Sequence, residues 1–228
     1  MTNHILPTLF KCLAGLPLSW VRLLGHITGS LLWLFNTRSA RITLRNIELC
    51  FPDLSPDERK QLAKQSLQQT AQTAMEAGAI WRHSWPWVKS KIVAMEGHEL
   101  LQAKVAEGKG VLVLAPHHGN WEVVAPYLAS VAPLTAMYQP IENPEMDKLV
   151  LEGRSKININ MAPTNRKGVM MLFKALQSGH IVGILPDQLP DSDSGRIVAP
   201  FMGVPAWTMT LVHGLIQQTA QPVRWINP

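Results

Sequence analysis

Short apolar runs alternate with longer stretches of helical periodicity along most of this chain. Residues 111–115, 134–138 and 180–186 are apolar runs with the length of buried strands, and 92–96 has a similar pattern. Apolar residues at helical spacing predict helices at 55–81, 98–107, from about 120, 143–157, 166–178 and 205–220. Strands that alternate with helices predict an α/β fold in which helices flank a mostly parallel sheet.

Several predicted helices carry recognisable boundary residues. Ser55 and Glu58 have the spacing of a capping box. Asn143 precedes Pro144, which suits an N-cap followed by proline at the first helical position. Gly179 is expected to stop the helix 166–178.

The segment 5–35 is mostly apolar, but Lys11, Arg22 and His26 interrupt it. No uninterrupted run reaches the ~20 apolar residues of a clear transmembrane helix. A tilted span with snorkelling charges, an amphipathic helix in the membrane interface and a buried core helix all remain open. The arginines that follow directly favour a cytoplasmic face for the rest of the chain.

The net charge and its distribution indicate which class of partner the protein binds. The chain has a net charge of +5, and no acidic residue precedes Glu48. An anionic partner is therefore expected, and the apolar character of the same region favours lipid over nucleic acid. No Arg/Lys-rich run interleaved with aromatics indicates a nucleic-acid surface. Cys12 and Cys50 lack metal-ligand spacing and are expected to be free thiols.

Polar residues cluster directly after the predicted strand 111–115, in the stretch APHHGNWE. His117 and Glu122 are five residues apart, so they can meet only if His117 lies in the turn and Glu122 in the first helical turn. Glu122 would then hydrogen-bond one imidazole nitrogen and leave the other free to act as a base. Backbone N–H groups around Gly119 and Asn120 could stabilise an oxyanion.

Simpler interpretations of this cluster remain open. His117 could cap a turn, and Glu122 could be a favourable first-turn acid. A metal site is not expected, because the adjacent His117 and His118 do not easily share one ion. The stretch 187–195 lacks the glycine and glutamate positions of a calcium loop.

Four ordered blocks resemble one known family. HHGNWE (117–122) resembles the H-x(4)-[D/E] signature of the glycerolipid-type acyltransferase superfamily, in the form found in late lipid A biosynthesis acyltransferases of the lauroyl/myristoyl type. The other blocks are YQPIENPEMDKLVLEGR (138–154), GHIVGILPDQLP (179–190) and PFMGVPAWTMT (200–210). The resemblance covers roughly residues 10 to 220.

The resemblance implies an enzyme on the cytoplasmic face of the inner membrane. It would transfer an acyl chain from acyl carrier protein to a hydroxyl of a lipid A precursor. His117 would be the base and Glu122 its partner, while Arg154, Arg166 and Asp187 would join Gly119 and Asn120 in substrate binding. The motif contains no Ser or Cys, so no acyl-enzyme is expected, and no cofactor beyond the carrier's own phosphopantetheine.

The same resemblance divides the chain into a membrane-anchoring helix, 1–36, and a glycerolipid acyltransferase-like domain, 37–228. Two features depart from the family pattern. Gln139 stands where the family often has Arg, and the chain stops soon after the last predicted helix. Residues 221–228 are therefore expected to form a weakly held sheet edge. The alternatives are another glycerolipid or glycolipid acyltransferase, or a C-terminally truncated inactive homologue. Without the resemblance, Arg154 would be a helix-end cation and Asp187 an Asx turn.

Overall fold

The computed structural model describes residues 5–155, 159–189, 195–219 and 223–226. Contacts divide the chain into two compact units. The first, here called the sheet unit, comprises Met1–Pro7, Ile80–Ile197 and Thr208–Pro228. The second, here called the helical unit, comprises Thr8–Ala79 and Val198–Trp207.

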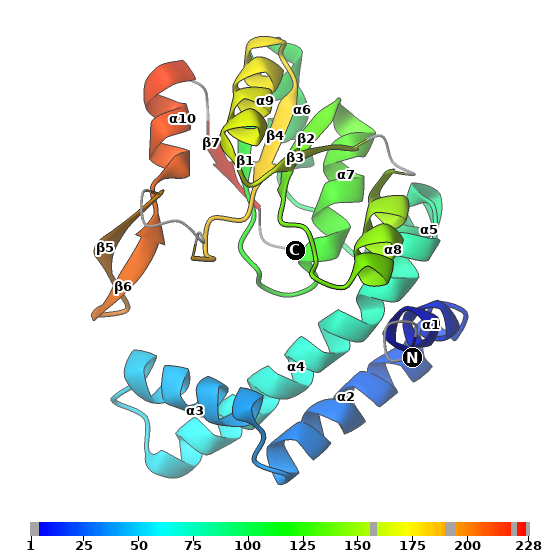
Figure 1. Cartoon of the computed structure of the whole chain (residues 1–228), viewed down its shortest axis with the longest axis vertical. Coiled ribbons are helices and arrows are strands. Elements are labelled where there is room, and N and C mark those ends of the chain that lie inside the picture. Colours follow the sequence, from blue (N-terminus) through cyan, green and yellow to red (C-terminus); the bar gives the residue numbers. More distant parts are fainter. Residues whose placement is uncertain (1–4, 156–158, 190–194, 220–222, 227–228) are drawn as a thin grey trace. The chain divides into compact units, whose positions relative to one another are not determined.

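The apolar N-terminal segment forms more than one helix. The first helices are α1 (Ile5–Leu13), α2 (Leu18–Leu34), α3 (Arg38–Cys50) and α4 (Pro56–Arg82) (Figure 1). Pro17 separates α1 from α2, because proline tolerates the first turn of a helix but interrupts its interior. Helix α3 was not predicted. Among the described residues no single helix is both long and apolar enough to cross a bilayer, and α2 and α3 qualify only together, as a pair bent by 83°.

Helix α2 packs very closely against α4. Val21, Gly25 and Gly29 are its buried residues. A Cβ atom at Gly25 would lie 2.5 Å from Cα of Gln72, and one at Gly29 would lie 2.4 Å from Cα of Gln68. Only glycine therefore permits this approach, and the opposite side of α2 is left exposed.

Helix α4 confirms the predicted capping box. The backbone N–H of Ser55 donates to Glu58 Oε2 at 2.8 Å, and the backbone N–H of Glu58 donates to Ser55 Oγ at 3.3 Å. These hydrogen bonds lower the pKa of the Glu58 carboxyl, with the side-chain bond of Ser55 as the largest cause. The helix then continues into the sheet unit, where Trp81 lies in its last turn.

The sheet unit is built on parallel strands, as predicted. Its sheet has the order β3-β2-β4-β1-β7 among the described residues, and each of its pairings is parallel. The strands are β1 (Val111–Leu114), β2 (Leu134–Tyr138), β3 (Ile159–Pro163), β4 (Ile181–Ile184) and β7 (Val223–Trp225). The helices are α5 (Trp85–Lys89), α6 (His98–Ala106), α7 (Val124–Val131), α8 (Pro144–Ser155), α9 (Arg166–Gln177) and α10 (Leu211–Thr219).

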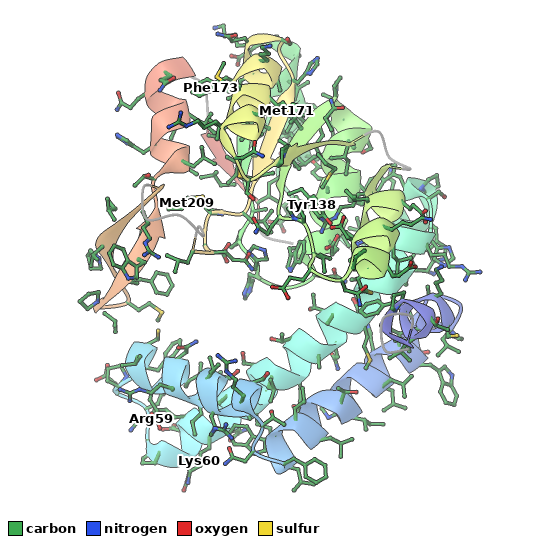
Figure 2. All side chains as sticks on the ribbon, in the orientation of Figure 1. Arg59, Lys60, Tyr138, Met171, Phe173 and Met209 are labelled. Carbon is green, nitrogen blue, oxygen red and sulfur yellow. The ribbon has the colours of Figure 1, made fainter. Side chains whose placement is uncertain are left out.

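Helices cover both faces of this sheet. Val111 and Val113 of β1 belong to a cluster with Leu101 of α6 and Leu128 of α7. Leu112 and Leu114, which alternate with them, belong to a second cluster with α9 and α10, against which Met171, Phe173 and Met209 pack (Figure 2). Strands β1 and β4 are buried at every residue, which explains their continuous apolar runs.

Two sequence-based expectations about elements were wrong, and one strand of the sheet was missed. Residues 92–96 form no strand, and Val93 is fully exposed there. Residues 205–209 are not the start of the last helix but part of β6 (Val204–Met209), which pairs with β5 (Arg196–Phe201). Met202 and Gly203 between these strands both have positive φ, the backbone of a tight hairpin turn. Strand β3 was also missed.

The C-terminal segment behaves in part as expected. Strand β7 occupies one edge of the sheet and pairs with β1. The predicted helix 205–220 and the predicted weak edge 221–228 extend into residues 220–222 and 227–228, which lie outside the described residues. The last two residues of the predicted helix 143–157 lie outside them as well. The weak attachment of this edge stays a prediction.

Candidate active site

The register of two neighbouring strands brings His117 and Asp187 together. Strands β1 and β4 pair in parallel with Leu114 opposite Ile184. Each strand is followed by one apolar residue and a proline, so the next residues, His117 and Asp187, leave the sheet at equivalent positions. Parallel strands of open α/β sheets present ligand sites at this carboxyl end.

Asp187 holds His117 through two hydrogen bonds. The backbone N–H of His117 donates to Asp187 Oδ2 at 2.8 Å, and the ring Nδ1 lies 2.9 Å from Oδ1. A carboxylate only accepts, so Nδ1 carries a proton and the neutral ring has its lone pair on Nε2. The arrangement therefore presents a histidine in the tautomer of a general base.

This pairing corrects the partner expected from sequence spacing. Glu122 was expected to hydrogen-bond His117, but the carboxylate at the imidazole belongs to Asp187. Glu122 lies in the short 3₁₀ helix Trp121–Val123 and is only 4% exposed. Its carboxylate meets Arg154 and Trp81 instead, because this short turn buries the side chain.

Glu122 and Arg154 form a buried ion pair. Nη2 of Arg154 donates to Glu122 Oε1 at 2.6 Å, and Nε1 of Trp81 donates to the other carboxylate oxygen, Oε2, at 2.9 Å. Gly153 allows α8 to lie directly against Trp81, since a Cβ at this position would lie 2.5 Å from Cβ of Trp81. Arg154 and Glu122 were predicted site residues, whereas Trp81 was not, because its only signal in the sequence was its place at the end of an amphipathic helix.

Aromatic rings connect Arg154 to the histidine. The Arg154 guanidinium carbon lies 5.8 Å from the Trp121 ring centroid and 5.6 Å from that of Tyr138, within the range of cation–π attraction. The His117 ring meets Trp121 edge-on, with centroids 4.9 Å apart. Trp121 thus lies between the candidate base and the buried cation, and the site contains both groups.

Helix α8 is fixed at its start as well as its end. Asn143 Oδ1 accepts from the backbone N–H of Glu145 at 3.0 Å and of Met146 at 3.2 Å, which confirms the predicted N-cap. Asp147 accepts from the Tyr138 hydroxyl and from the backbone N–H of Ile141. Burial, followed by the hydrogen bond to Asp147, raises the pKa of Tyr138, so its hydroxyl remains a donor. These contacts determine where Arg154 lies.

The remaining predicted site residues lie around the same sheet edge. Gly119 has φ +58°, the left-handed backbone expected for the turn after His117. Asn120 directly precedes the 3₁₀ helix. Arg166 is the exposed first residue of α9, which follows β3. Gln139 hydrogen-bonds Thr164 across the loops after β2 and β3.

The candidate site combines a histidine in the tautomer of a base, an orienting carboxylate and a positioned cation. Such a set suits proton removal from a hydroxyl combined with stabilisation of negative charge. Within the described ranges, no group of three or more His, Cys, Asp or Glu side chains is arranged to hold a metal ion.

Comparison with known proteins identifies the family. The sequence model of the bacterial lipid A biosynthesis acyltransferases matches residues 4–224. The lipid A biosynthesis lauroyltransferase of Escherichia coli (strain K12) is 31% identical over 75% of this chain and 55% of its own length. A lipid A biosynthesis acyltransferase of Haemophilus influenzae is 30% identical over 86% of this chain and 62% of its own length.

A third relative is the lipid A biosynthesis palmitoleoyltransferase of Escherichia coli (strain K12). It is 28% identical over 81% of this chain and 61% of its own length. The chain therefore spans between about half and three fifths of the length of these relatives. The chain belongs to the bacterial lipid A biosynthesis acyltransferase family.

Proposed function

We propose that this member of the lipid A biosynthesis acyltransferase family transfers an acyl chain from acyl carrier protein to a hydroxyl of a lipid A precursor. Family membership and the names of its relatives support acyl transfer in lipid A synthesis. The observation that carries the chemistry is the His117–Asp187 pair, which orients an imidazole at the carboxyl edge of the sheet.

In the proposed reaction Nε2 of His117 removes the proton of the acceptor hydroxyl. The hydroxyl oxygen attacks the thioester carbonyl of the donor and forms the new ester bond. The carbon–sulfur bond then breaks, and the imidazolium returns its proton to the departing thiolate. Asp187 stabilises the imidazolium between these steps. The acyl group passes directly to the acceptor, without an acyl-enzyme.

Arg154 supplies the positive charge of the proposed site. Its guanidinium is held by Glu122 and lies against the rings of Trp121 and Tyr138, so little reorganisation is needed when negative charge appears. We assign to it the thioester oxyanion or a substrate phosphate. Glu122 acts by positioning Arg154. The backbone around Gly119 and Asn120 and the exposed Arg166 are the other proposed substrate contacts.

The proposed location is the cytoplasmic face of the inner membrane. Large apolar residues are exposed along one side of α2 at spacings of three and four: Trp20, Leu23, Ile27, Leu31 and Leu34. A helix that buries one side and exposes an apolar one is suited to the interface of a bilayer. We propose that α2 attaches the protein to the membrane by this side.

The direct test is incubation with acyl carrier proteins charged with chains of several lengths, together with a lipid A precursor. Mass spectrometry should show one added acyl group per acceptor. His117→Ala protein should form this product at least about a hundredfold more slowly. Acylation of glycerol phosphate lipids instead, or no product from any donor, would contradict the proposed function.

A further inference from the structure

A row of arginines lies along one side of α3. Arg38, Arg41 and Arg45 are three and four residues apart, so one helical face carries all of them. Together with Ile42 and Asn46 they line an open surface depression of about 300 Å³. This arginine row belongs to the helical unit and takes no part in the site described above.

The charges of this row are poorly compensated within the protein. Arg38 and Arg41 stand in the first turn of α3, where the helix dipole is positive and acidic side chains are lacking. The neighbours Arg41 and Arg45 also repel each other. Among the described residues their partners are weak or neutral: Arg45 meets Glu48 at 3.4 Å on the surface, and Arg41 donates to the backbone oxygen of Asn36. An external anion bound beside these arginines would offset both the unfavourable helix dipole and the repulsion between Arg41 and Arg45.

Apolar side chains accompany the arginines. Leu34 and Phe35, at the corner between α2 and α3, are 72% and 73% exposed. Ile42 lines the arginine depression itself and is also exposed. A purely acidic protein partner would match the charges but not these side chains. Anionic phospholipids match both, because their phosphates lie directly above hydrocarbon.

We infer that Arg38, Arg41 and Arg45 bind the phosphate groups of anionic membrane lipids, while Leu34, Phe35 and Ile42 enter the acyl boundary. The occupant is a bilayer surface rather than a free phosphate or a protein. This inference rests on the proposed membrane location of α2 and adds to it a preference for anionic headgroups.

Vesicle binding of the full chain tests the inference. Flotation is measured with phosphatidylcholine vesicles and with vesicles that also contain about 30% phosphatidylglycerol. Replacing Arg38, Arg41 and Arg45 by Gln should weaken binding to the anionic vesicles by about a hundredfold, since each basic residue near such a surface contributes about fivefold. Binding to neutral vesicles, which depends on apolar side chains, should stay within about twofold of the parent.

A matched control removes the same charge elsewhere. Lys64, Lys89 and Lys109 are exposed lysines outside α3, and their replacement by Gln should change anionic binding only slightly. Replacement of the arginine row by Lys should keep most of the preference. An equal loss in the lysine control, or unchanged binding in the Arg→Gln protein, would overturn the inference.

Two further outcomes separate this inference from its alternatives. If the Arg→Gln protein keeps its vesicle preference but loses affinity for acyl carrier protein, the row is a protein-docking surface and the inference is wrong. If it loses binding to both vesicle types while its thermal midpoint is unchanged, the attachment is not selective for anionic lipid, and the inference is again wrong. Acyl transfer to a detergent-dissolved acceptor tests the proposed function separately, because it does not require the vesicle.

Discussion

Two carboxylates of the candidate site have different surroundings, and from these we propose different tasks. Asp187 is 41% exposed and contacts the imidazole of His117, whereas Glu122 is almost fully buried and contacts a guanidinium and an indole. Asp187 can respond to charge that appears on His117 during a reaction. Glu122 is already committed to a permanent cation, so its main effect is on the position of Arg154.

Asp187→Asn is expected to lower kcat by at least about a hundredfold, because the amide cannot stabilise the imidazolium and can favour the wrong tautomer. The free energy of unfolding should change little, since the carboxylate is partly exposed. Steady-state kinetics and urea unfolding of the same preparation check both parts. A variant that keeps parental kcat would remove Asp187 from the mechanism.

Glu122→Gln is expected to act first on stability. The change leaves the largely buried Arg154 without its counter-ion, which costs about 3–5 kcal/mol of unfolding free energy. Glu152→Gln in α8, the helix that carries Arg154, is the control, because its ion pair with Lys148 is exposed and should contribute less than about 1 kcal/mol. Equal unfolding free energies for the two variants would contradict the positioning role of Glu122.

His117→Ala should lower turnover by roughly a hundredfold or more, the usual contribution of a general base. His118→Ala should have a much smaller effect, because His118 is exposed and the groups that donate to the Asp187 carboxylate belong to its neighbour, His117. Single-turnover measurements with a saturating donor compare the two. Equal losses would show that the adjacent histidines share the role.

At the level of elements, the sequence predicted the parallel α/β architecture and the strands β1, β2 and β4 correctly. Strands β1 and β4 are buried at every residue and β2 at three of its five residues, so each appears in the sequence as a short, mainly apolar run. Strand β3 (INMAP) has no such run, because it lies at one edge of the sheet and its Asn160 is exposed. The hairpin β5–β6 was missed because PAWTM has a spacing that fits a helix as well as a strand.

The partner of His117 could have been predicted with one more step. The stretches VLVLAPH and IVGILPD have the same length from strand start to polar residue, and each contains a proline one position before its end. If the two strands are neighbours in register, His117 and Asp187 must meet. Neighbourhood and register are tertiary properties, however, and local spacing within HHGNWE pointed to Glu122 instead.

The contact of α2 with α4 makes a prediction at this scale. Gly25→Ala and Gly29→Ala each place a methyl group within 2.5 Å of backbone carbon, so the helices must separate and stability should fall by about 1–3 kcal/mol per change. Gly214→Ala in α10 is the control, because nothing lies within 4 Å of its Cβ position. That change should leave stability equal or slightly higher. Urea unfolding that shows no difference among the three variants would contradict the close packing.

For the whole molecule, the proposed membrane attachment and the proposed chemistry belong to different units. The base, its carboxylate and the buried cation all lie in the sheet unit, and the exposed apolar side of α2 and the arginine row lie in the helical unit. Helix α4 has residues in both units, and Trp81 in its last turn donates a hydrogen bond to Glu122. An acceptor whose acyl chains stay in the bilayer requires such a division, because its reacting hydroxyl must reach a site outside the hydrocarbon.

Replacing Leu23, Ile27 and Leu31 by Gln tests the attachment directly. These side chains are 52%, 43% and 46% exposed, so each should contribute roughly 1 kcal/mol when a bilayer covers it, and together they should change membrane partition by about a hundredfold. After cell lysis in high salt, the altered protein should move from the membrane pellet to the supernatant. The control replaces Ile197, Val198 and Phe201 of β5, which are at least as exposed. If the control releases the protein and the α2 change does not, the hairpin is the membrane contact, and the outer side of α2 must be covered by something else.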